Sequence, residues 1–132
     1  TEHRAKQVSL EELLAACDVV SIHLPLDQTT KNLIDGNMLK KMKPSAILLN
    51  FARGGIVDEN ELCRLLKRGH LNGAALDVFS CEPPKSRSLI ELDNVIATPH
   101  IGGSSDEAVI AMGLAALKGV LNPKNASFYM EI

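Results

Sequence analysis

The sequence predicts an α/β domain, with a parallel sheet of four strands and helices on both of its faces. Apolar runs that begin near residues 18, 46, 73 and 94 alternate with helix-capping patterns, a spacing typical of β-α-β units. Right-handed crossovers between such strands give a parallel sheet. The apolar residues include only three Phe and one Tyr. A core of mainly Ala, Val, Ile and Leu suits a sheet that is covered on both faces.

The first half of the chain is expected to form two helices and two strands. Ser9-Leu-Glu-Glu12 has the pattern of a capping box, in which Ser9 is the N-cap and Glu12 reaches back to it. Residues 18–24 form the first expected strand. Asp35 is placed to cap a short helix, and the apolar run 46–51 is typical of a strand buried on both faces.

The second half continues the alternation. Asp58-Glu-Asn-Glu61 is another capping pattern, and its helix should reach Gly69, a good residue for the position after a helix end. Residues 72–79 and 94–98 are the remaining expected strands. A last, Ala-rich helix is expected to start at Ser104 and to run to about Lys118. The expected domain therefore comprises residues 1–118, followed by an irregular tail, 119–132.

Composition excludes several classes of function. The chain has 132 residues, enough for one domain, and a net charge of −2, so no basic field favours nucleic acid. No apolar stretch approaches the roughly 18 residues of a membrane span, and the N-terminus lacks a signal-peptide pattern. Cys17, Cys63 and Cys81 share no metal-ligand spacing. These features predict a cytoplasmic protein with reduced thiols and no metal site.

Three polar side chains follow the ends of three different expected strands. Arg53 follows the second strand, Glu82 the third and His100 the fourth. Because the carboxyl ends of parallel strands meet at the edge where such sheets bind ligands, these side chains should gather there. A histidine–carboxylate pair can move a proton, and an arginine can hold a carboxylate in a bidentate fork.

The segments around these residues resemble the D-isomer-specific 2-hydroxyacid dehydrogenases. The similarity extends from about Ser9 to about Lys118, and the D-3-phosphoglycerate dehydrogenases are the nearest branch. The segments are Asp18-Val-Val-Ser-Ile-His-Leu-Pro-Leu26, Met42-Lys-Pro-Ser-Ala-Ile-Leu-Leu-Asn50, Ala52-Arg-Gly-Gly-Ile-Val-Asp-Glu59, Gly73-Ala-Ala-Leu-Asp-Val-Phe79 with Glu82-Pro-Pro84, and Thr98-Pro-His-Ile-Gly-Gly103. The resemblance implies a partial Rossmann-type domain, the C-terminal part of the family's NAD-binding domain.

The resemblance also implies an activity and a set of roles. The activity is hydride transfer between NAD or NADP, with NAD favoured, and a D-2-hydroxy acid or its 2-keto acid. His100 is implied as the acid/base, Glu82 as the carboxylate that orients it, and Arg53 as the clamp on the substrate carboxylate. Without the resemblance, Glu82 would be interpreted as a solvated loop residue. For Arg53 the alternative is a loop arginine paired on the surface, but Gly54-Gly55 directly after it favours a crowded site. Cys81 stands where the family often has an acidic residue.

The implied cofactor site draws on four parts of the chain. Asp77 is expected at the nicotinamide end, and a charge at the end of an apolar strand needs a partner or a place at the sheet edge. For His23 a purely structural role at the strand end remains open. The implied cofactor residues are His23, Leu24, Pro25, Phe51, Ala52, Arg53, Asp77, His100, Ile101, Gly102 and Gly103.

One expected feature of dinucleotide-binding domains is missing from the sequence. None of its nine glycines makes the G-x-G-x-x-G turn that seats a pyrophosphate. Gly54-Gly55 and Gly102-Gly103 are doublets that follow strands and allow close backbone approach. The chain is therefore expected to match the second half of such a domain and to lack the separate substrate domain. We expect this chain alone to bind the cofactor weakly or not at all, and to be inactive.

Other functions on the same scaffold remain open. One is a dehydrogenase of a small anion such as formate or phosphite. Another is an NAD(H)-sensing, corepressor-like binding protein, because such relatives can keep the same three polar residues. For the dehydrogenase, the expected partners are a small 2-hydroxy or 2-keto acid, of which 3-phosphoglycerate is one candidate, and a second copy of the chain in a homodimer.

Overall fold

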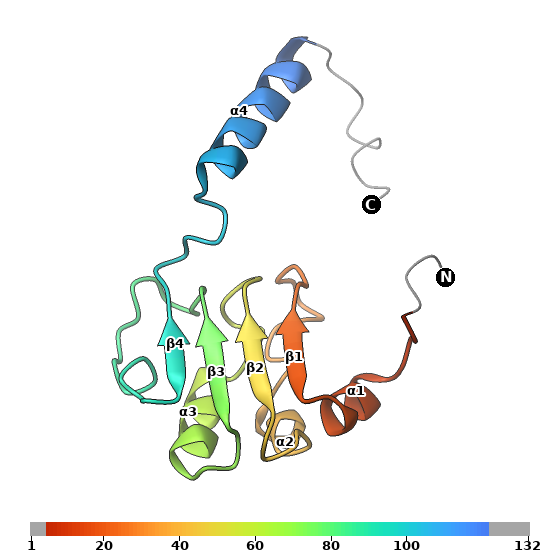
Figure 1. Cartoon of the computed structure of the whole chain (residues 1–132), viewed down its shortest axis with the longest axis vertical. Coiled ribbons are helices and arrows are strands. Elements are labelled where there is room, and N and C mark those ends of the chain that lie inside the picture. Colours follow the sequence, from red (N-terminus) through yellow and green to blue (C-terminus); the bar gives the residue numbers. More distant parts are fainter. Residues whose placement is uncertain (1–4, 122–132) are drawn as a thin grey trace. The chain divides into compact units, whose positions relative to one another are not determined.

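The computed structural model describes residues 5–121. It comprises two compact units, and the boundary between them falls between His100 and Ile101. The first unit contains the sheet and three helices, and the second contains one helix (Figure 1).

The sheet has four short parallel strands in sequence order (Figure 1). They are β1 (Val19–Ile22), β2 (Ile47–Asn50), β3 (Gly73–Leu76) and β4 (Val95–Ala97). The register aligns Val20 with Leu48, Leu48 with Ala74, and Ala74 with Val95. The predicted α/β architecture with a parallel sheet is therefore confirmed. Because all four strands run the same way, their carboxyl ends lie at one edge.

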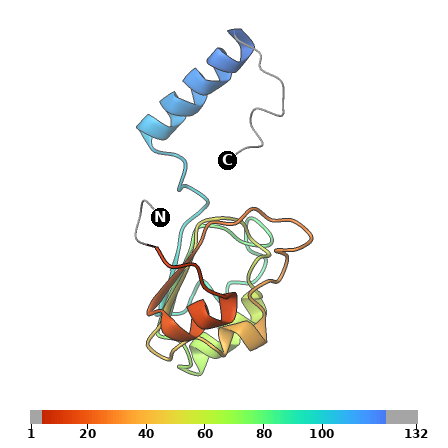
Figure 2. The same ribbon diagram turned by 90° about the vertical axis from the view of Figure 1, so that its right-hand side faces the viewer.

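The helices of this unit are α1 (Leu10–Ala16), α2 (Gly36–Leu39) and α3 (Glu59–Lys67). They lie side by side on the same face of the sheet (Figure 2). The sequence analysis expected helices on both faces. Each new strand is added on the same side of the previous one, so right-handed crossovers return every helix to one face. Within residues 5–100, the second face carries no helix.

The two faces of the sheet differ accordingly in burial. Leu48, in the centre of the sheet, and Leu62, on α3, are fully buried in the layer between sheet and helices. Side chains on the other face are more exposed: Val19 on β1 is 53% exposed and Ile96 on β4 is 69% exposed. The core of this unit is thus a single layer, bounded on one side by the helices.

Each of these helices begins at the N-cap residue that the sequence predicted. Ser9 Oγ accepts the N–H of Glu12 at 3.2 Å. Asp35 and Asp58 each accept two N–H groups from their own first turns, at 2.9–3.1 Å. The Glu12 carboxylate, which was expected to reach back to Ser9, contacts Lys6 Nζ at 3.3 Å. Capping by a side-chain oxygen therefore fixes where every helix of this unit starts.

The end of α3 also follows the prediction. Gly69 has a φ of +68° directly after the helix. Its N–H donates to Leu66 O at 3.0 Å, and the N–H of His70 donates to Leu65 O at 2.9 Å. These two bonds form a Schellman motif, which glycine favours because it has no Cβ.

The second unit contains α4 (Asp106–Leu121). Ser105 Oγ accepts the N–H of Ala108 at 3.2 Å and so caps its first turn. The helix continues past the expected end at Lys118, and residues 122–132 of the expected tail lie outside the described part of the chain. None of the side chains of α4 is buried. Within residues 5–121, no helix is both long and apolar enough to cross a membrane.

Candidate active site

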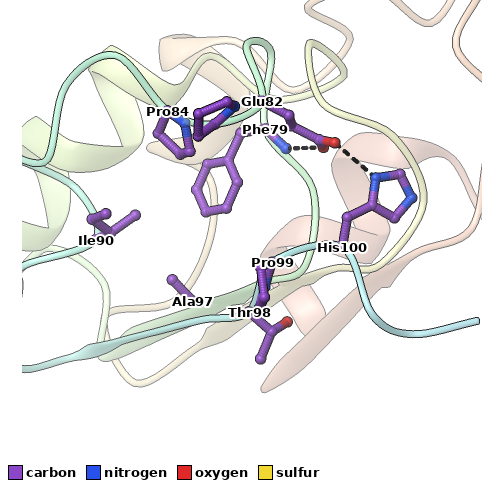
Figure 3. A pocket seen from close by; sticks show the side chains of 9 residues that line it. Phe79, Glu82, Pro84, Ile90, Ala97, Thr98, Pro99 and His100 are labelled. Carbon is purple, nitrogen blue, oxygen red and sulfur yellow. Dashed lines mark hydrogen bonds and ion pairs between the residues drawn. The ribbon is translucent and has the colours of Figure 1, made fainter. Parts of the chain in front are cut away.

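Glu82 and His100, from the segments that follow β3 and β4, are hydrogen-bonded to each other (Figure 3). Glu82 Oε2 lies 2.8 Å from His100 Nδ1. The other carboxylate oxygen, Oε1, accepts the N–H of Phe79 at 3.0 Å. The Glu82 side chain is 38% exposed and that of His100 is 46% exposed. The pair that the sequence analysis inferred is therefore in direct contact and open to a ligand.

Glu82 is held in its ionised form. The hydrogen bond from His100 and the bond from the N–H of Phe79 lower the pKa of Glu82 below its ordinary value, while desolvation and the charge of Asp77 oppose them. An ionised carboxylate only accepts hydrogen bonds, so His100 Nδ1 must be the donor. Nε2 is then the ring nitrogen that can exchange a proton with a bound molecule.

The backbone of His100 is strained. Its φ is +55°, in the left-handed region that side chains with a Cβ rarely adopt. A non-glycine residue in that region costs about 1–3 kcal/mol, and such residues are concentrated at functional sites. The surrounding chain, which includes the bond from the N–H of Thr98 to Leu76 O at 3.0 Å, holds this segment in place.

Arg53 lies in the loop after β2, where Asn50 braces the backbone. Asn50 is 3% exposed. Its Nδ2 donates to Arg53 O at 3.0 Å, and its Oδ1 accepts the N–H of Ala52 at 3.1 Å. The Arg53 side chain is exposed, and Nη1 donates to Ala52 O at 2.7 Å. Within residues 5–121, the guanidinium makes no hydrogen bond to another strand or helix, so it can rearrange toward a ligand.

Gly54 lies directly against the backbone that leads to Glu82. A Cβ on Gly54 would lie 1.9 Å from the carbonyl carbon of Phe79 and 2.4 Å from the nitrogen of Ser80. Gly55 has a φ of +81°, and a Cβ there would make only ordinary contacts with the Leu26 side chain, at 3.8–3.9 Å. The sequence analysis predicted a close backbone approach at this doublet. The structure places that approach at Gly54, between the loop of Arg53 and the segment that carries Glu82.

Six of the expected cofactor residues line one concavity of about 650 Å³ at the ends of β1 and β2. The chain contributes two segments to it, His23-Leu24-Pro25-Leu26 and Phe51-Ala52-Arg53. Leu26 was not among the expected residues. Its place next to Pro25, in the same turn after a strand, is the signal that would have identified it.

His23 directly follows β1, and its Nε2 lies 2.7 Å from the Oγ of Ser21 in that strand. This contact fits the structural role that the sequence analysis left open for His23. Asp77 is 3% exposed, and its Oδ1 accepts the hydroxyl of Thr98 at 2.5 Å. Asp77 therefore joins the ends of β3 and β4. Its contact with a cofactor stays a prediction.

The remaining expected cofactor residues, Ile101, Gly102 and Gly103, belong to the second unit. Ile101 is 51% exposed, and nothing lies within 4 Å of a Cβ placed on Gly103. Their part in a cofactor site also stays a prediction.

An apolar cavity of about 490 Å³ lies beside the Glu82–His100 pair (Figure 3). Both residues of the pair contribute to its wall. The other residues that line it are Phe79, Pro83, Pro84, Ile90, Ala97, Thr98 and Pro99. Because apolar walls exclude water, the bond between Glu82 and His100 is partly shielded on this side.

Together, the parallel sheet and the polar residues at its carboxyl edge define a class, the Rossmann-type nucleotide-binding α/β domain. The model of one family, described as "D-isomer specific 2-hydroxyacid dehydrogenase, NAD binding domain", matches residues 1–102. The chain belongs to this family, as the sequence analysis predicted.

Individual relatives agree with this assignment. The chain is 54% identical over 110 residues to D-3-phosphoglycerate dehydrogenase from Haemophilus influenzae, covering 79% of this chain. Among solved structures, a glyoxylate reductase from Paecilomyes thermophila is 34% identical over 88% of this chain, with a TM-score of 0.80. A D-lactate dehydrogenase from Aquifex aeolicus, complexed with NAD and lactic acid, is 32% identical over 86% of this chain, with a TM-score of 0.74.

The matched regions are a minor part of these relatives. The chain spans 27% of the length of the phosphoglycerate dehydrogenase, 36% of the glyoxylate reductase and 40% of the lactate dehydrogenase.

Proposed function

We propose that this chain supplies the acid–base pair and part of the cofactor site of an NAD-dependent oxidoreductase. The reaction is the interconversion of a D-2-hydroxy acid and its 2-keto acid. The observation that carries the proposal is the 2.8 Å bond between Glu82 Oε2 and His100 Nδ1, because it leaves Nε2 to move a proton. The family membership of the chain supports the same reaction.

Each of the three polar residues has a distinct role. His100 Nε2 donates a proton to the keto oxygen during reduction and removes it from the hydroxyl during oxidation. Glu82 fixes the ring in the tautomer that carries the proton on Nδ1 and stabilises the imidazolium. Arg53 binds the substrate carboxylate, for which a planar guanidinium offers two parallel N–H donors.

We assign part of the dinucleotide site to the concavity at the ends of β1 and β2. It lies at the carboxyl edge of a parallel sheet, and its lining combines apolar residues such as Leu24 and Phe51 with the polar side chains of His23 and Arg53. Residues 23–26 and 51–53 would hold the cofactor there. When bound, NAD supplies or accepts the hydride of this reaction. NAD is favoured over NADP because the family description names NAD and a structural relative was solved with it.

The substrate is a small 2-hydroxy acid, and 3-phosphoglycerate is the leading candidate. The similarity to D-3-phosphoglycerate dehydrogenase over 79% of this chain supports this choice. Glyoxylate and lactate, which the names of two structural relatives indicate, are the next candidates.

A substrate screen with the full-length protein tests the proposal. The absorbance of NADH is followed with the 2-keto acid of 3-phosphoglycerate, with glyoxylate and with pyruvate, and NADPH is tested in parallel. Formate and phosphite are tested with NAD. Turnover of a 2-keto acid supports the proposal. Turnover of formate or phosphite alone, or NADH binding with no turnover, would replace it by one of the two alternatives from the sequence analysis.

We also propose that the protein acts as a homodimer in the cytoplasm. The large apolar residues that α4 exposes, such as Ile110 and Leu117, support self-association. The free thiols of Cys17, Cys63 and Cys81 support a reducing compartment. Sedimentation of the full-length protein at several concentrations tests the dimer.

A further inference from the structure

Glu59, the first residue of α3, binds the segment that precedes Glu82. One of its carboxylate oxygens accepts the N–H of Ser80 at 2.6 Å, and the other accepts the Ser80 hydroxyl at 3.0 Å. Both oxygens are therefore bound to a single residue that lies 21 positions away in the sequence. Hydrogen bonds to an ionised carboxylate are stronger than those between neutral groups.

Capping of α3 does not explain the contacts that the Glu59 carboxylate makes. Asp58 is the N-cap and already accepts the N–H groups of Asn60 and Glu61. The Glu59 carboxylate is thus bound outside its own helix. A negative charge at the N-terminus of α3 also interacts favourably with the helix dipole.

The next step leads from Ser80 to the acid–base pair. Two consecutive backbone N–H groups bind two different carboxylates. The N–H of Phe79 donates to Glu82, and the N–H of Ser80 donates to Glu59. The peptide between Phe79 and Ser80 also lies against Gly54, where a Cβ would be only 1.9 Å from it. This short segment is therefore fixed from the α3 side by Glu59 and from the β2 side by Gly54.

We propose that Glu59 is a positioning residue: it holds the Phe79–Ser80 segment so that Glu82 lies opposite His100. Glu59 is not a catalytic residue, because the contacts above are to Ser80 and not to the acid–base pair. The inference rests on the proposed acid–base role of that pair. It adds a residue that the sequence analysis had treated only as part of a helix-capping pattern.

The primary test measures the Glu82 carboxyl directly, by ¹³C NMR titration of the protein and of three variants. Glu59→Ala removes both bonds to Ser80, and Glu59→Gln keeps one acceptor oxygen. Glu61→Gln is the matched control, because Glu61 lies on the same helix and its carboxylate pairs with Arg64. We expect Glu59→Ala to raise the pKa of Glu82 toward its ordinary value, Glu59→Gln to raise it less, and Glu61→Gln to leave it unchanged.

The second readout is turnover by the full-length protein. If the acid–base pair is displaced, kcat should fall by about 10- to 100-fold in Glu59→Ala, as expected for misplacement of a catalytic group. The KM for the cofactor should stay unchanged, and Glu59→Gln should restore part of the kcat. Circular dichroism confirms that each variant is folded, and Ser80→Ala, which removes only the hydroxyl partner, serves as a milder version of the same change.

The two readouts separate this inference from the proposed function. An unchanged Glu82 titration in folded Glu59→Ala and Glu59→Gln overturns the positioning role, whatever the activity. A shifted titration together with a protein that turns over no 2-keto acid supports the positioning role and overturns the proposed function.

Discussion

The two halves of the candidate site are organised differently. In the acid–base half, Glu82 is bonded to His100 and to the backbone of Phe79, so its carboxylate is oriented before any ligand arrives. In the clamp half, Asn50 fixes the backbone around Arg53. Among the residues that the structure describes, the guanidinium is bonded only to the carbonyl of Ala52. One half has a fixed side chain, and the other has a fixed backbone with an adjustable side chain.

This difference matches what each half has to do in the proposed reaction. A proton donor must lie within hydrogen-bond reach of one atom of the substrate, so prior orientation lowers the barrier. A carboxylate clamp has to close around a substrate that enters from solvent, and a long exposed side chain allows that. Substitutions in one half, or at the contact between the two, test how independent the halves are.

The largest effect is expected from His100→Ala. Removing the proton donor should lower kcat by about 10²- to 10⁴-fold, the range of general acid catalysis. Cofactor affinity should fall much less than kcat, because the concavity lined by residues 23–26 and 51–53 keeps all of its residues. Stopped-flow kinetics under conditions where chemistry limits turnover provide the measurement. An unchanged rate would remove His100 from the acid–base role.

Arg53→Lys should affect binding rather than the proton transfer. Lysine keeps the charge but loses the planar fork, and loss of a hydrogen bond to a charged group corresponds to about 10- to 100-fold in affinity. We expect a higher KM for the keto acid, an unchanged pH profile and at most a small change in NADH binding by fluorescence, because the other residues of the concavity are unaltered. A shifted pH profile would show that the two halves are coupled more closely than their contacts indicate.

Gly54→Ala should disturb both halves at once, because this residue separates them. The added Cβ meets backbone atoms that cannot move aside, so we expect a loss of about 3 kcal/mol in the free energy of unfolding. Gly55→Ala is the control. Its Cβ would meet only the Leu26 side chain at ordinary contact distance, so the substitution should cost about 1 kcal/mol for the positive φ. Urea denaturation measures both, and equal losses would argue against the contact with Phe79.

Glu82→Gln should produce the smallest effect, a shift in pH dependence. The lowered pKa of Glu82 keeps its carboxylate charged at every pH where an imidazole titrates, so the charge favours the imidazolium throughout. Reduction of a keto acid should slow as pH rises, because the donor loses its proton. When glutamine replaces the charged Glu82, the midpoint of the decline in reduction rate should move to lower pH. A midpoint that moves to higher pH would contradict the role of Glu82.

Local sequence predicted most of the fold and the proximity of Glu82 and His100, whereas their proposed acid–base roles came from the family resemblance. Ser9, Asp35 and Asp58 act as caps through bonds within four residues of the chain, and such bonds can be inferred from a short segment. The proximity of Glu82 and His100 was predicted from a general rule: the carboxyl ends of neighbouring parallel strands lie at the same edge of the sheet. That rule needs only the strand positions and their direction.

Features that depend on three-dimensional packing were not predictable in this way. The bond between Glu59 and Ser80 joins a helix to a distant loop, and a glutamate in a capping pattern gives no sign of it. The doublet Gly54-Gly55 indicated a close approach, but its partner, the backbone of Phe79, became known only from the structure. Helices were expected on both faces because apolar strands suggest full burial, whereas the strand order placed α1, α2 and α3 on one face.

The buried amide of Asn50 has a consequence for comparing distant sequences. It donates to the carbonyl of Arg53 and accepts from the N–H of Ala52, so the loop requires one donor and one acceptor on a short side chain. Aspartate has no donor, leucine has neither group, and glutamine is longer by one methylene. An asparagine that ends the second strand is therefore a marker for the arginine three residues later. In a divergent sequence, its presence would help to align this loop where overall similarity has faded.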